Sequence, residues 1–508
     1  MRFNFFQPKA SLAPATLNHE GALAFKLDAR TELYAAVVTA ALQDNFYEKA
    51  DGRLDRIKEL VAQNDPAFVA KLAVYTRTQM HLRSVALVLV AELARQHTGD
   101  SLVSRSISRV ICRADEITEL LAYYQFSNAR QGTKRLNRLS KQVQKGIALA
   151  FNKFDEYQFA KYNRAAEVKL RDALFLVHPK AKDEAQQNLF DKIVQNTLAT
   201  PYTWETELSA LGQIKFATSE QRGWAFAHKW EELLDSGKLG YMALLRNLRN
   251  LLELDISEKH IANLCAYLAN EKAVQNAKQL PFRYLAAYRE VSNLKSEYTA
   301  QVLTALEEAV KVSIRNVQGF GAEIKVVIAC DVSGSMQKPI SAKSKILLYD
   351  IGLMLGMLLQ HRCKNVVTGM FGDRWKIINL PQTGVLRNVQ EFYQREGEVG
   401  YSTNGYLVIR DLRQRKVIAD KVMLFTDVQL WNSTGDGGHL ASEWKQYKSI
   451  APNARLYLFD LAGYGHAPIQ LIRHDVFLIA GWSDKVFSVL KAIENGQEAL
   501  AGIEAVEV

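Results

Sequence analysis

Oxygen-bearing side chains follow an apolar run near residue 330. Asp331, Ser333 and Ser335 stand at alternate positions directly after the run 326–330. A buried strand that opens into a loop at this point would place three oxygen ligands at one strand end. Taken alone, the D-x-S-x-S pattern also fits a capped turn before a helix.

Two further oxygen ligands occur downstream. Thr403 lies in the polar segment 400–404, and Asp427 follows a second apolar run, 422–426. Hard divalent cations prefer carboxylate, hydroxyl and water oxygens over nitrogen or sulfur. Together with Asp331, Ser333 and Ser335, these residues therefore predict a site for a divalent cation, bound directly or through water. Mg²⁺ is the expected ion, with Mn²⁺ and Ca²⁺ as alternatives.

The C-terminal third alternates apolar strands with helices. Further strands are predicted at 365–371, 375–380, 422–425, 456–460 and 476–480, and helices at 341–359 and 385–395. Such alternation predicts an α/β fold with a doubly wound, mostly parallel sheet. Ligands of these sheets gather at the carboxyl ends of the strands, where Asp331 and Asp427 are expected.

The oxygen ligands and this order of elements resemble a von Willebrand factor A domain with a metal-ion-dependent adhesion site. We assign residues 319–508 to this domain. The resemblance implies that the cation offers its open coordination position to a carboxylate of a protein partner.

Residues 30 to 315 have a different pattern, a long series of short amphipathic helices. Leu54, Ile57 and Leu60 recur at helical spacing, and breakers such as Asp65-Pro66 separate units of one or two helices. Stacked helix pairs form a solenoid with a long surface for extended partners. No clean sequence period is present, so the repeats are degenerate.

This helical part is similar to the TROVE module of the Ro autoantigen family, which we place at residues 1–318. The four stretches that carry the similarity begin at Leu17 (LNHEGA), Leu174 (LFLVHPK), Met242 (MALLRNLRN) and Leu280 (LPFRY). The resemblance implies a monomeric ring of HEAT-like helices closed by the metal-binding domain. It also implies a small structured (Y-like) noncoding RNA as partner, misfolded RNA whose ends enter the ring, and an exoribonuclease partner in RNA quality control.

Basic residues are concentrated in one segment of the helical part. Between Arg130 and Lys182 there are 13 Lys and Arg against 4 Asp and Glu, whereas the whole chain carries a formal charge of +10. From residue 323 onward the counts are 21 and 19. Such a concentration is typical of a surface that binds a polyanion.

The first candidate RNA-binding group begins at Arg130. Lys134, Arg138, Lys141 and Lys145 are spaced by four, three and four residues, which predicts one face of a single helix. Phosphates would bind this face without sequence being recognised. The ordinary alternative is the solvated back of a helix.

The second candidate group consists of Lys161, Arg164, His178 and Lys180. The family resemblance places Lys161 and His178 at positions that hold the small structured RNA. The family's second basic residue falls nearer Ala165 than Arg164.

Composition and motifs exclude several other classes of protein. The chain has 508 residues, 48% hydrophobic and 23% charged, and contains no run of eighteen apolar residues and no signal-peptide core, so a cytoplasmic protein is expected. The four cysteines form no C-x-x-C pair, and no hydrolase or nucleotide-binding motif is present. We therefore expect a binding protein and no enzyme. The competing hypothesis is a metal-dependent protein-adhesion or assembly module without an RNA role.

Overall fold

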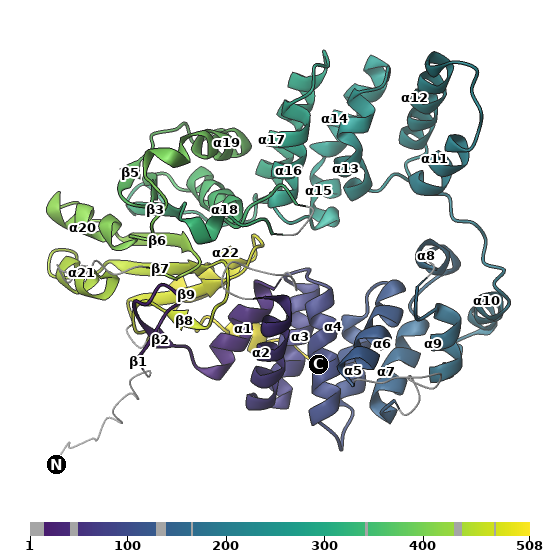
Figure 1. Ribbon diagram of the computed structural model, residues 1–508, viewed down its shortest axis with the longest axis horizontal. Helices are drawn as coiled ribbons and strands as arrows, with labels where there is room; N and C mark the ends of the chain where they lie inside the picture. Colours follow the sequence, from purple (N-terminus) through teal and green to yellow (C-terminus); the bar gives the residue numbers. More distant parts are fainter. Residues whose placement is uncertain are drawn as a thin grey trace. The chain divides into compact units, whose positions relative to one another are not determined.

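The chain folds into two compact units. The computed structural model describes residues 15–40, 49–128, 139–163, 166–340, 344–430, 439–471 and 474–508. Residues 1–55 and 317–500 form one unit, which we call the α/β unit, and residues 56–316 and 501–508 form the other, the helical unit. Figure 1 labels the elements of both.

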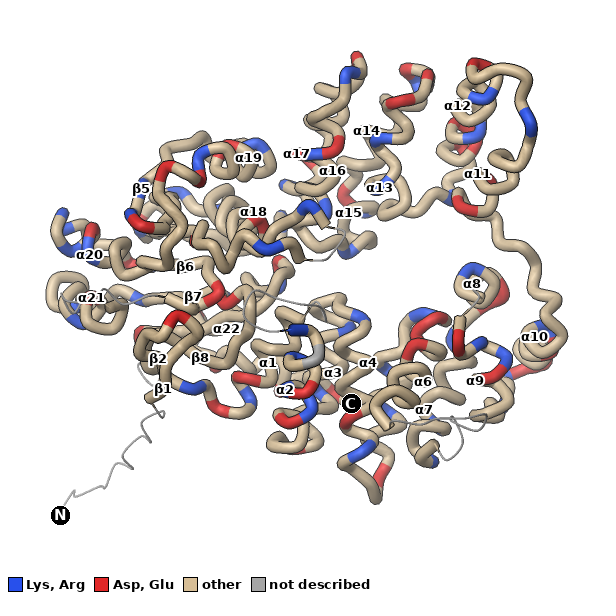
Figure 2. The backbone as a smooth tube through the Cα atoms, in the orientation of Figure 1, with Lys and Arg blue, Asp and Glu red and all other residues tan. Residues whose placement is uncertain are grey.

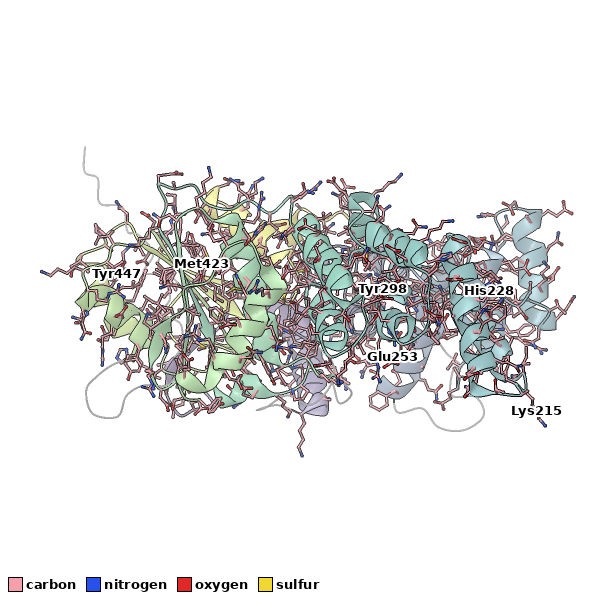
Figure 3. All side chains as sticks on the ribbon, turned by 90° about the horizontal axis from the view of Figure 1, so that it is seen from above. Lys215, His228, Glu253, Tyr298, Met423 and Tyr447 are labelled. Atoms are coloured by element: carbon pink, nitrogen blue, oxygen red, sulfur yellow. The ribbon has the colours of Figure 1, made fainter. Side chains whose placement is uncertain are left out.

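A six-stranded sheet is the centre of the α/β unit. Its order is β5 (Trp375–Ile377), β4 (Val366–Phe371), β3 (Val326–Asp331), β6 (Lys421–Thr426), β7 (Arg455–Asp460) and β9 (Val476–Ala480). Only β5 is antiparallel to its neighbour. The strands β3 and β6 are buried along their whole lengths, as in parallel sheets covered on both faces. Met423 of β6 lies among the side chains of this unit (Figure 3).

Five α-helices accompany the sheet among the described residues that follow β3. They are α18 (Leu348–Arg362), α19 (Val385–Arg395), α20 (Tyr406–Gln414), α21 (Leu440–Tyr447) and α22 (Val486–Glu494), with the short 3-10 helices η1 (Gly334–Gln337) and η2 (Glu396–Glu398). The helix α18 packs on β3 and β6 and is buried along most of its length. The predicted doubly wound α/β fold is thus confirmed.

One predicted helix of this unit begins later than expected. The helix predicted at 341–359 starts at Leu348, and residues 344–346 are not helical. Ile340 N–H donates to the carbonyl of Ile346 at 2.9 Å, which closes a turn before the helix. The carboxylate of Asp350 then accepts the N–H of Leu347 at 2.8 Å and fixes the helix start. Residues 341–343 lie outside the described residues. The predicted strand at 375–380 is also shorter and ends at Ile377.

The first residues of the chain belong to the α/β unit. Strands β1 (Ala15–Leu17) and β2 (Leu23–Lys26) form a hairpin, and β2 pairs with β8 (His466–Ala467). Helix α1 (Ala29–Val38) follows, and the hydroxyl of Tyr34 donates to the carbonyl of Ala480 at 2.8 Å. Buried Arg53 donates to the carbonyl of Ala462 at 2.6 Å. The junction between residues 316 and 317 lies two residues from the predicted boundary, whereas residues 1–55, which were assigned to the helical module, belong to the α/β unit.

The last residues belong to the helical unit. Helix α23 (Ala501–Glu504) packs on α3 (Pro66–Thr78), and Lys71 Nζ donates to the carbonyl of Glu504 at 2.6 Å. The guanidinium of Arg109 donates to the carbonyl of Glu507 at 2.6 Å. The observed α/β unit therefore ends before the predicted limit at residue 508.

The helical unit is a succession of short helices. After α2 (Ala50–Gln63), which crosses the division, and α3 come α4 (Ser84–Gln96), α5 (Leu102–Val110), α6 (Asp115–Ser127), α7 (Lys141–Phe151), α8 (Glu156–Tyr162), α9 (Leu170–Val177), α10 (Glu184–Gln195), α11 (Trp204–Gly212), α12 (Ser219–Asp235), α13 (Tyr241–Leu252), α14 (Glu258–Leu268), α15 (Glu271–Ala277), α16 (Phe282–Ser292) and α17 (Thr299–Ser313). Each packs mainly on helices close to it in the chain, as in helical-repeat proteins. No helix of the described residues is long and apolar enough to cross a membrane.

Helices α5 and α7 are in close contact at Gly146. A Cβ atom on Gly146 would lie 2.7 Å from Ile107 Cβ and 2.9 Å from the carbonyl oxygen of Ser104. In contrast, a Cβ on Gly223 of α12 would meet no atom within 4 Å. The two glycines stand within helices of one unit and differ only in the space around them.

We predict that Gly146→Ala lowers the free energy of unfolding by about 1–3 kcal/mol, because the added methyl group forces the two helices apart. Gly223→Ala is the matched control and should raise it by about 0.5–1 kcal/mol, because alanine favours the helix. Chemical denaturation of both variants measures the two effects. A stabilised Gly146→Ala protein would contradict the close contact.

Candidate functional site

Two parallel strands bring the carboxylates of Asp331 and Asp427 to the same edge of the sheet. The pairing of β3 with β6 runs to Cys330 and Phe425, so Asp331 and Thr426 come next in line. The hydroxyl of Thr426 donates to Asp331 Oδ2 at 2.6 Å. Asp427 follows immediately and accepts the N–H of Gln429 on Oδ1 at 3.1 Å.

The loop after β3 is folded against Asp331. Ser333 N–H donates to Asp331 Oδ1 at 2.9 Å, and the hydroxyl oxygens of Ser333 and Ser335 are 3.2 Å apart. The N–H of Gly334 donates to the carbonyl of Tyr401 at 2.9 Å. This last bond joins the serine loop to the segment that contains Thr403.

The segment of Thr403 is held by the turn after β4. Asn404 N–H donates to the carbonyl of Gly372 at 3.3 Å, and Ser402 N–H donates to Asp373 Oδ1 at 3.0 Å. A Cβ on Gly372 would lie 2.1 Å from the carbonyl oxygen of Gly400, so only glycine fits there. The five predicted metal ligands thus lie on three loops. The loop after β3 is hydrogen-bonded to the segment of Thr403, and the loops after β3 and β6 follow adjacent strands.

All five of these side chains are buried, with at most 4% of their surface exposed. Within the described structure, Thr403 Oγ1 and Asp427 Oδ2 are buried without a hydrogen-bond partner. Burial raises the pKa of Asp331, and burial followed by the charge of Asp331 raises that of Asp427. Unpaired buried oxygens next to two opposed carboxylates are the environment that a divalent cation would stabilise.

The donor set fits a hard cation better than a soft one. Hydroxyl and carboxylate oxygens suit Mg²⁺, Mn²⁺ or Ca²⁺, and few anionic ligands leave such an ion electrophilic. The described residues contain no group of three or more His, Cys, Asp and Glu side chains arranged around a common ion position. The hydroxyls of Ser333, Ser335 and Thr403 would therefore carry much of the coordination.

Three residues at this edge were missed by the sequence analysis. Thr426 and Gln429 hydrogen-bond the two carboxylates, as described above. Asp460 ends β7 and is fully buried, and its charge contributes to the raised pKa of Asp427 after burial and Asp331. Its position at the end of a predicted strand, next in the sheet to Asp427, was the available signal.

The first group of predicted RNA-binding residues does not form one helix face. Helix α7 begins only at Lys141, because Ser140 has an extended backbone and its hydroxyl accepts the N–H of Val143 at 3.2 Å. Lys141 and Lys145 are exposed one turn apart on α7. The prediction of a single helix through all four residues is therefore wrong. Arg130, Lys134 and Arg138 lie outside the described residues.

The second predicted group is spread over two helices and a loop. Lys161 stands in the last turn of α8, and His178 ends α9 in a left-handed conformation with φ 45°. Lys180 is exposed, and its carbonyl accepts from Asn152 Nδ2 at 2.9 Å. Arg164 lies outside the described residues.

Lys161 also lines a cavity of about 250 Å³ in the helical unit. The cavity is rich in aromatic rings and in basic side chains, and Figure 2 shows basic residues on α8 and α13, which contribute to it. Its charged lining residues are Arg113, Lys161, Lys238, Arg246 and Glu205, and its aromatic ones are Tyr157, Tyr162, Tyr202 and Trp204. The lining includes neither His178 nor Lys180.

The cations around this cavity pack on aromatic rings. Lys161 Nζ lies 5.5 Å from the ring centre of Tyr157, and Lys238 Nζ lies 5.2 Å from that of Tyr202. The guanidinium of Arg113 lies 4.3 Å from the ring centre of Tyr162 and also pairs with Asp115 at 2.6 Å. The tyrosine rings thus orient these cationic side chains without neutralising their charge.

Positive charge is poorly balanced in this part of the unit. Across the described residues, Lys161, Lys238 and Arg246 form no ion pair with a carboxylate. Partial burial and the positive charges of Arg246 and Arg83 lower the pKa of Arg283. The arginines therefore stand close enough to repel one another, as expected where an anionic ligand binds.

The sequence analysis missed Arg113, Lys238 and Arg246 as site residues. Arg113 precedes Lys161 by 48 positions, and Lys238 and Arg246 follow it by 77 and 85, so no local pattern unites them with Lys161. The available signal was the stretch from Met242 to Asn250, which contains Arg246 and carries the family resemblance.

Comparison with known proteins assigns the helical part to a family. A model of the TROVE domain matches residues 30–221 and 197–328, which together cover more than half of the chain. The chain belongs to the TROVE domain family. The predicted resemblance to Ro proteins is thereby confirmed, and the matched region contains Lys141, Lys145, Lys161 and the whole lining of the cavity.

Two curated TROVE relatives and one solved structure are similar to the chain. It is 26% identical to telomerase protein component 1 of Mus musculus over 345 residues and 24% identical to that of Rattus norvegicus over 350 residues, or 51% and 54% of this chain. In each case the match spans 13% of the relative. The crystal structure of the Ro (Rsr) protein of Deinococcus radiodurans superposes with a TM-score of 0.59 at 19% identity, over 92% of this chain and 100% of that one. This likeness establishes a common fold of helical repeats plus an α/β domain.

We predict that Asp331→Ala abolishes binding of a divalent cation, because it removes one of two carboxylates and the anchor of the serine loop. The variant should stay folded, since the hydrogen bonds lost from Thr426 and Ser333 cost about 1–3 kcal/mol. Elemental analysis after dialysis against Mg²⁺, and the rise in melting temperature on adding Mg²⁺, are the two measurements.

Asp411→Asn on α20 is the control, because Asp411 makes only a surface ion pair with Arg415 at 3.1 Å. It should keep the metal content and the thermal shift of the unaltered protein. Equal metal content in Asp331→Ala and the control would refute the cation site.

Proposed function

We propose that this TROVE protein is a Ro-type RNA-binding protein that holds structured small noncoding (Y-like) RNA and the single-stranded ends of misfolded RNA. The observation that carries the proposal is the cavity in which Lys161, Lys238 and Arg246 stand among aromatic rings and, within the described part of the chain, have no carboxylate partner. Membership of the TROVE family supports it. The role is one of binding in RNA quality control in the cytoplasm, without catalysis.

The chemistry of the cavity suits a single strand. Backbone phosphates bind cationic side chains and release counterions, which gives affinity without sequence recognition. Unpaired bases stack on exposed rings, and such stacking tolerates any base. Tyr157, Tyr162 and Tyr202 stand beside the three cations and supply such rings. A duplex is too wide for a cavity of about 250 Å³, whereas an unpaired nucleotide can present both a base and a phosphate to it.

A second surface suits structured RNA. Lys141 and Lys145 are exposed on the same side of α7, and exposed Leu149 continues the row one turn later. Duplex RNA is recognised mainly through its shape and phosphates, and two cations one helical turn apart can contribute phosphate contacts. We assign the two basic sites to two parts of the RNA.

For the α/β unit we propose a bound Mg²⁺ held by Ser333, Ser335 and Thr403 with Asp331 and Asp427. The buried, unpartnered oxygens of Thr403 and Asp427 support this. When bound, the ion would supply an electrophilic position for a carboxylate. This property favours a docking role toward a protein such as an exoribonuclease, and we propose that the chain acts as a monomer.

We predict that the double substitution Lys161→Gln and Arg246→Gln weakens binding of an unstructured oligouridine and flattens its salt dependence. Each lost phosphate contact should reduce the log–log slope by roughly 0.7 for a single strand. Titrations at several salt concentrations measure the slope. The control is Lys445→Gln with Lys491→Gln, which removes the same charge from exposed positions of the α/β unit. Equal losses in both proteins would mean that net charge alone attracts RNA.

We predict that Lys141→Gln with Lys145→Gln weakens binding of an RNA hairpin and leaves oligouridine binding unchanged, because these lysines lie outside the cavity lining. The hairpin slope should fall by somewhat less than one unit for each lysine, roughly 0.7 to 0.9. Competition between the two RNAs on one sample completes the test. If the substitution affects both RNAs alike, the division into two sites is wrong.

A further inference from the structure

A groove of about 910 Å³ is lined by helices α11, α12 and α13 of the helical unit and by the segments that follow α11 and α13. Most of its large side chains are apolar, namely Leu208, Ile214, Phe216, Phe226, Trp230 and Leu254. The groove shares no lining residue with the cavity of Lys161. It is therefore a separate surface of the unit.

The apolar side chains of this groove are incompletely covered by the rest of the unit. Ile214 is 56% exposed, and Leu208 and Phe216 are half-buried. Helix α11, which supplies Leu208, has no fully buried side chain. Neighbouring apolar side chains that stay open to solvent favour contact with a partner.

Gly223 is unexplained by the fold of the chain itself. It stands in the interior of α12 and lines the groove. A Cβ atom at this position would meet no atom within 4 Å, so no contact within the described structure requires glycine. In a helix interior glycine costs about 0.5–1 kcal/mol relative to alanine, and it occurs where another molecule approaches the backbone closely. A partner that lies against α12 would account for this residue.

The groove has an unbalanced positive charge. Arg222 lines it, and its guanidinium lies 5.4 Å from the ring centre of Phe226. Within the part of the chain that the structure describes, Arg222 forms no ion pair with a carboxylate. Lys215 is exposed on the loop 213–218 (Figure 3), and this loop contains no acidic residue. Carboxylates of a partner would complement both cations.

The lining of the groove suits a protein segment better than RNA. Arg222 is its one cationic lining residue, whereas RNA binding depends on several phosphate contacts. The other charged lining residue is Glu253, whose carboxylate pairs with Arg249 at 2.8 Å. The aliphatic walls offer contacts to apolar side chains.

We propose that this groove binds an acidic amphipathic helix of a protein partner. The apolar face of the partner's helix enters the groove, and its carboxylates pair with Arg222 and Lys215. In this mode of recognition, apolar side chains three or four residues apart along a helix fill a groove between other helices. Gly223 gives the partner's backbone room to lie close to α12. The helical unit then holds a protein segment at a surface that is separate from its proposed RNA sites.

Selection from a displayed peptide library tests the proposal. The library consists of peptides of about fifteen residues with leucine or phenylalanine at helical spacing and random residues elsewhere. The unaltered protein should enrich peptides that are rich in Asp and Glu. Gly223→Leu fills the groove where the chain leaves room, and it should enrich none of them. Gln221→Leu is the matched control on α12, because Gln221 is exposed and does not line the groove, and it should enrich the same peptides.

Titration of one enriched peptide, labelled with a fluorophore, gives the size of each effect. Its Kd should rise roughly tenfold or more in Gly223→Leu, because the leucine occupies the place of the peptide. In Arg222→Gln it should rise about threefold, since one exposed ion pair is lost. Lys272→Gln removes the same charge from an exposed position of α15 and should leave the Kd unchanged. Melting temperatures check that each variant is folded, as expected because leucine favours a helix more than glycine does.

Three results would overturn the proposal. The first is a selection that enriches no peptide, or one in which Gly223→Leu enriches the same peptides as the unaltered protein. The second is enrichment of Lys and Arg in place of Asp and Glu, which would contradict the charge of the partner. The third is a Gly223→Leu protein that loses binding of oligouridine and keeps binding of the peptides, which would make the groove an RNA site.

Discussion

The burial of two carboxylates at the ends of adjacent parallel strands is the constraint on which the α/β unit depends. Desolvation disfavours the charged forms of Asp331 and Asp427, and the charge of Asp331 adds to the cost for Asp427. The hydroxyl of Thr426 and the N–H groups of Ser333 and Gln429 stabilise the charges in part. Since both pKa values stay raised, this compensation is incomplete without a cation. The cation that we propose for this site would offset the remaining cost.

Charged side chains of the helical unit are stabilised in a different way. Lys161, Lys238 and Arg113 lie against tyrosine rings, and among the residues that the structure describes only Arg113 also has a close carboxylate partner. A ring orients a cation through its quadrupole and covers its alkyl stem, yet it carries no opposite charge. The positive potential is thus preserved for a polyanion. An ion pair at each position would order the cationic side chain to a comparable degree, but it would weaken the positive electrostatic potential.

Elements of the fold could be predicted from the sequence where a local residue pattern is itself the cause of the element. The apolar runs of β3 and β6 predict buried strands, and the helix 385–395 is found at the predicted residues. Prediction failed where a single side chain ends or begins an element. Ser140 starts α7 and so breaks the predicted basic face, and Asp350 delays the start of α18. It also failed for the cavity, because Arg113, Lys161 and Arg246 are united only by the packing of distant helices.

The predicted boundary at residue 318 lies close to the junction at residues 316–317, but composition could not show that residues 1–55 belong to the α/β unit. The α/β unit is made of residues 1–55 and 317–500, so the helical unit interrupts it. The bond from Asn18 to Leu430 spans 412 residues, and no local signal marks such a pairing. Forming this contact has a large entropic cost of loop closure unless the intervening helices are already folded. The end of the sheet that bears Asp331 and Asp427 is thus completed by Asn18 and His19, which are distant from it in the sequence.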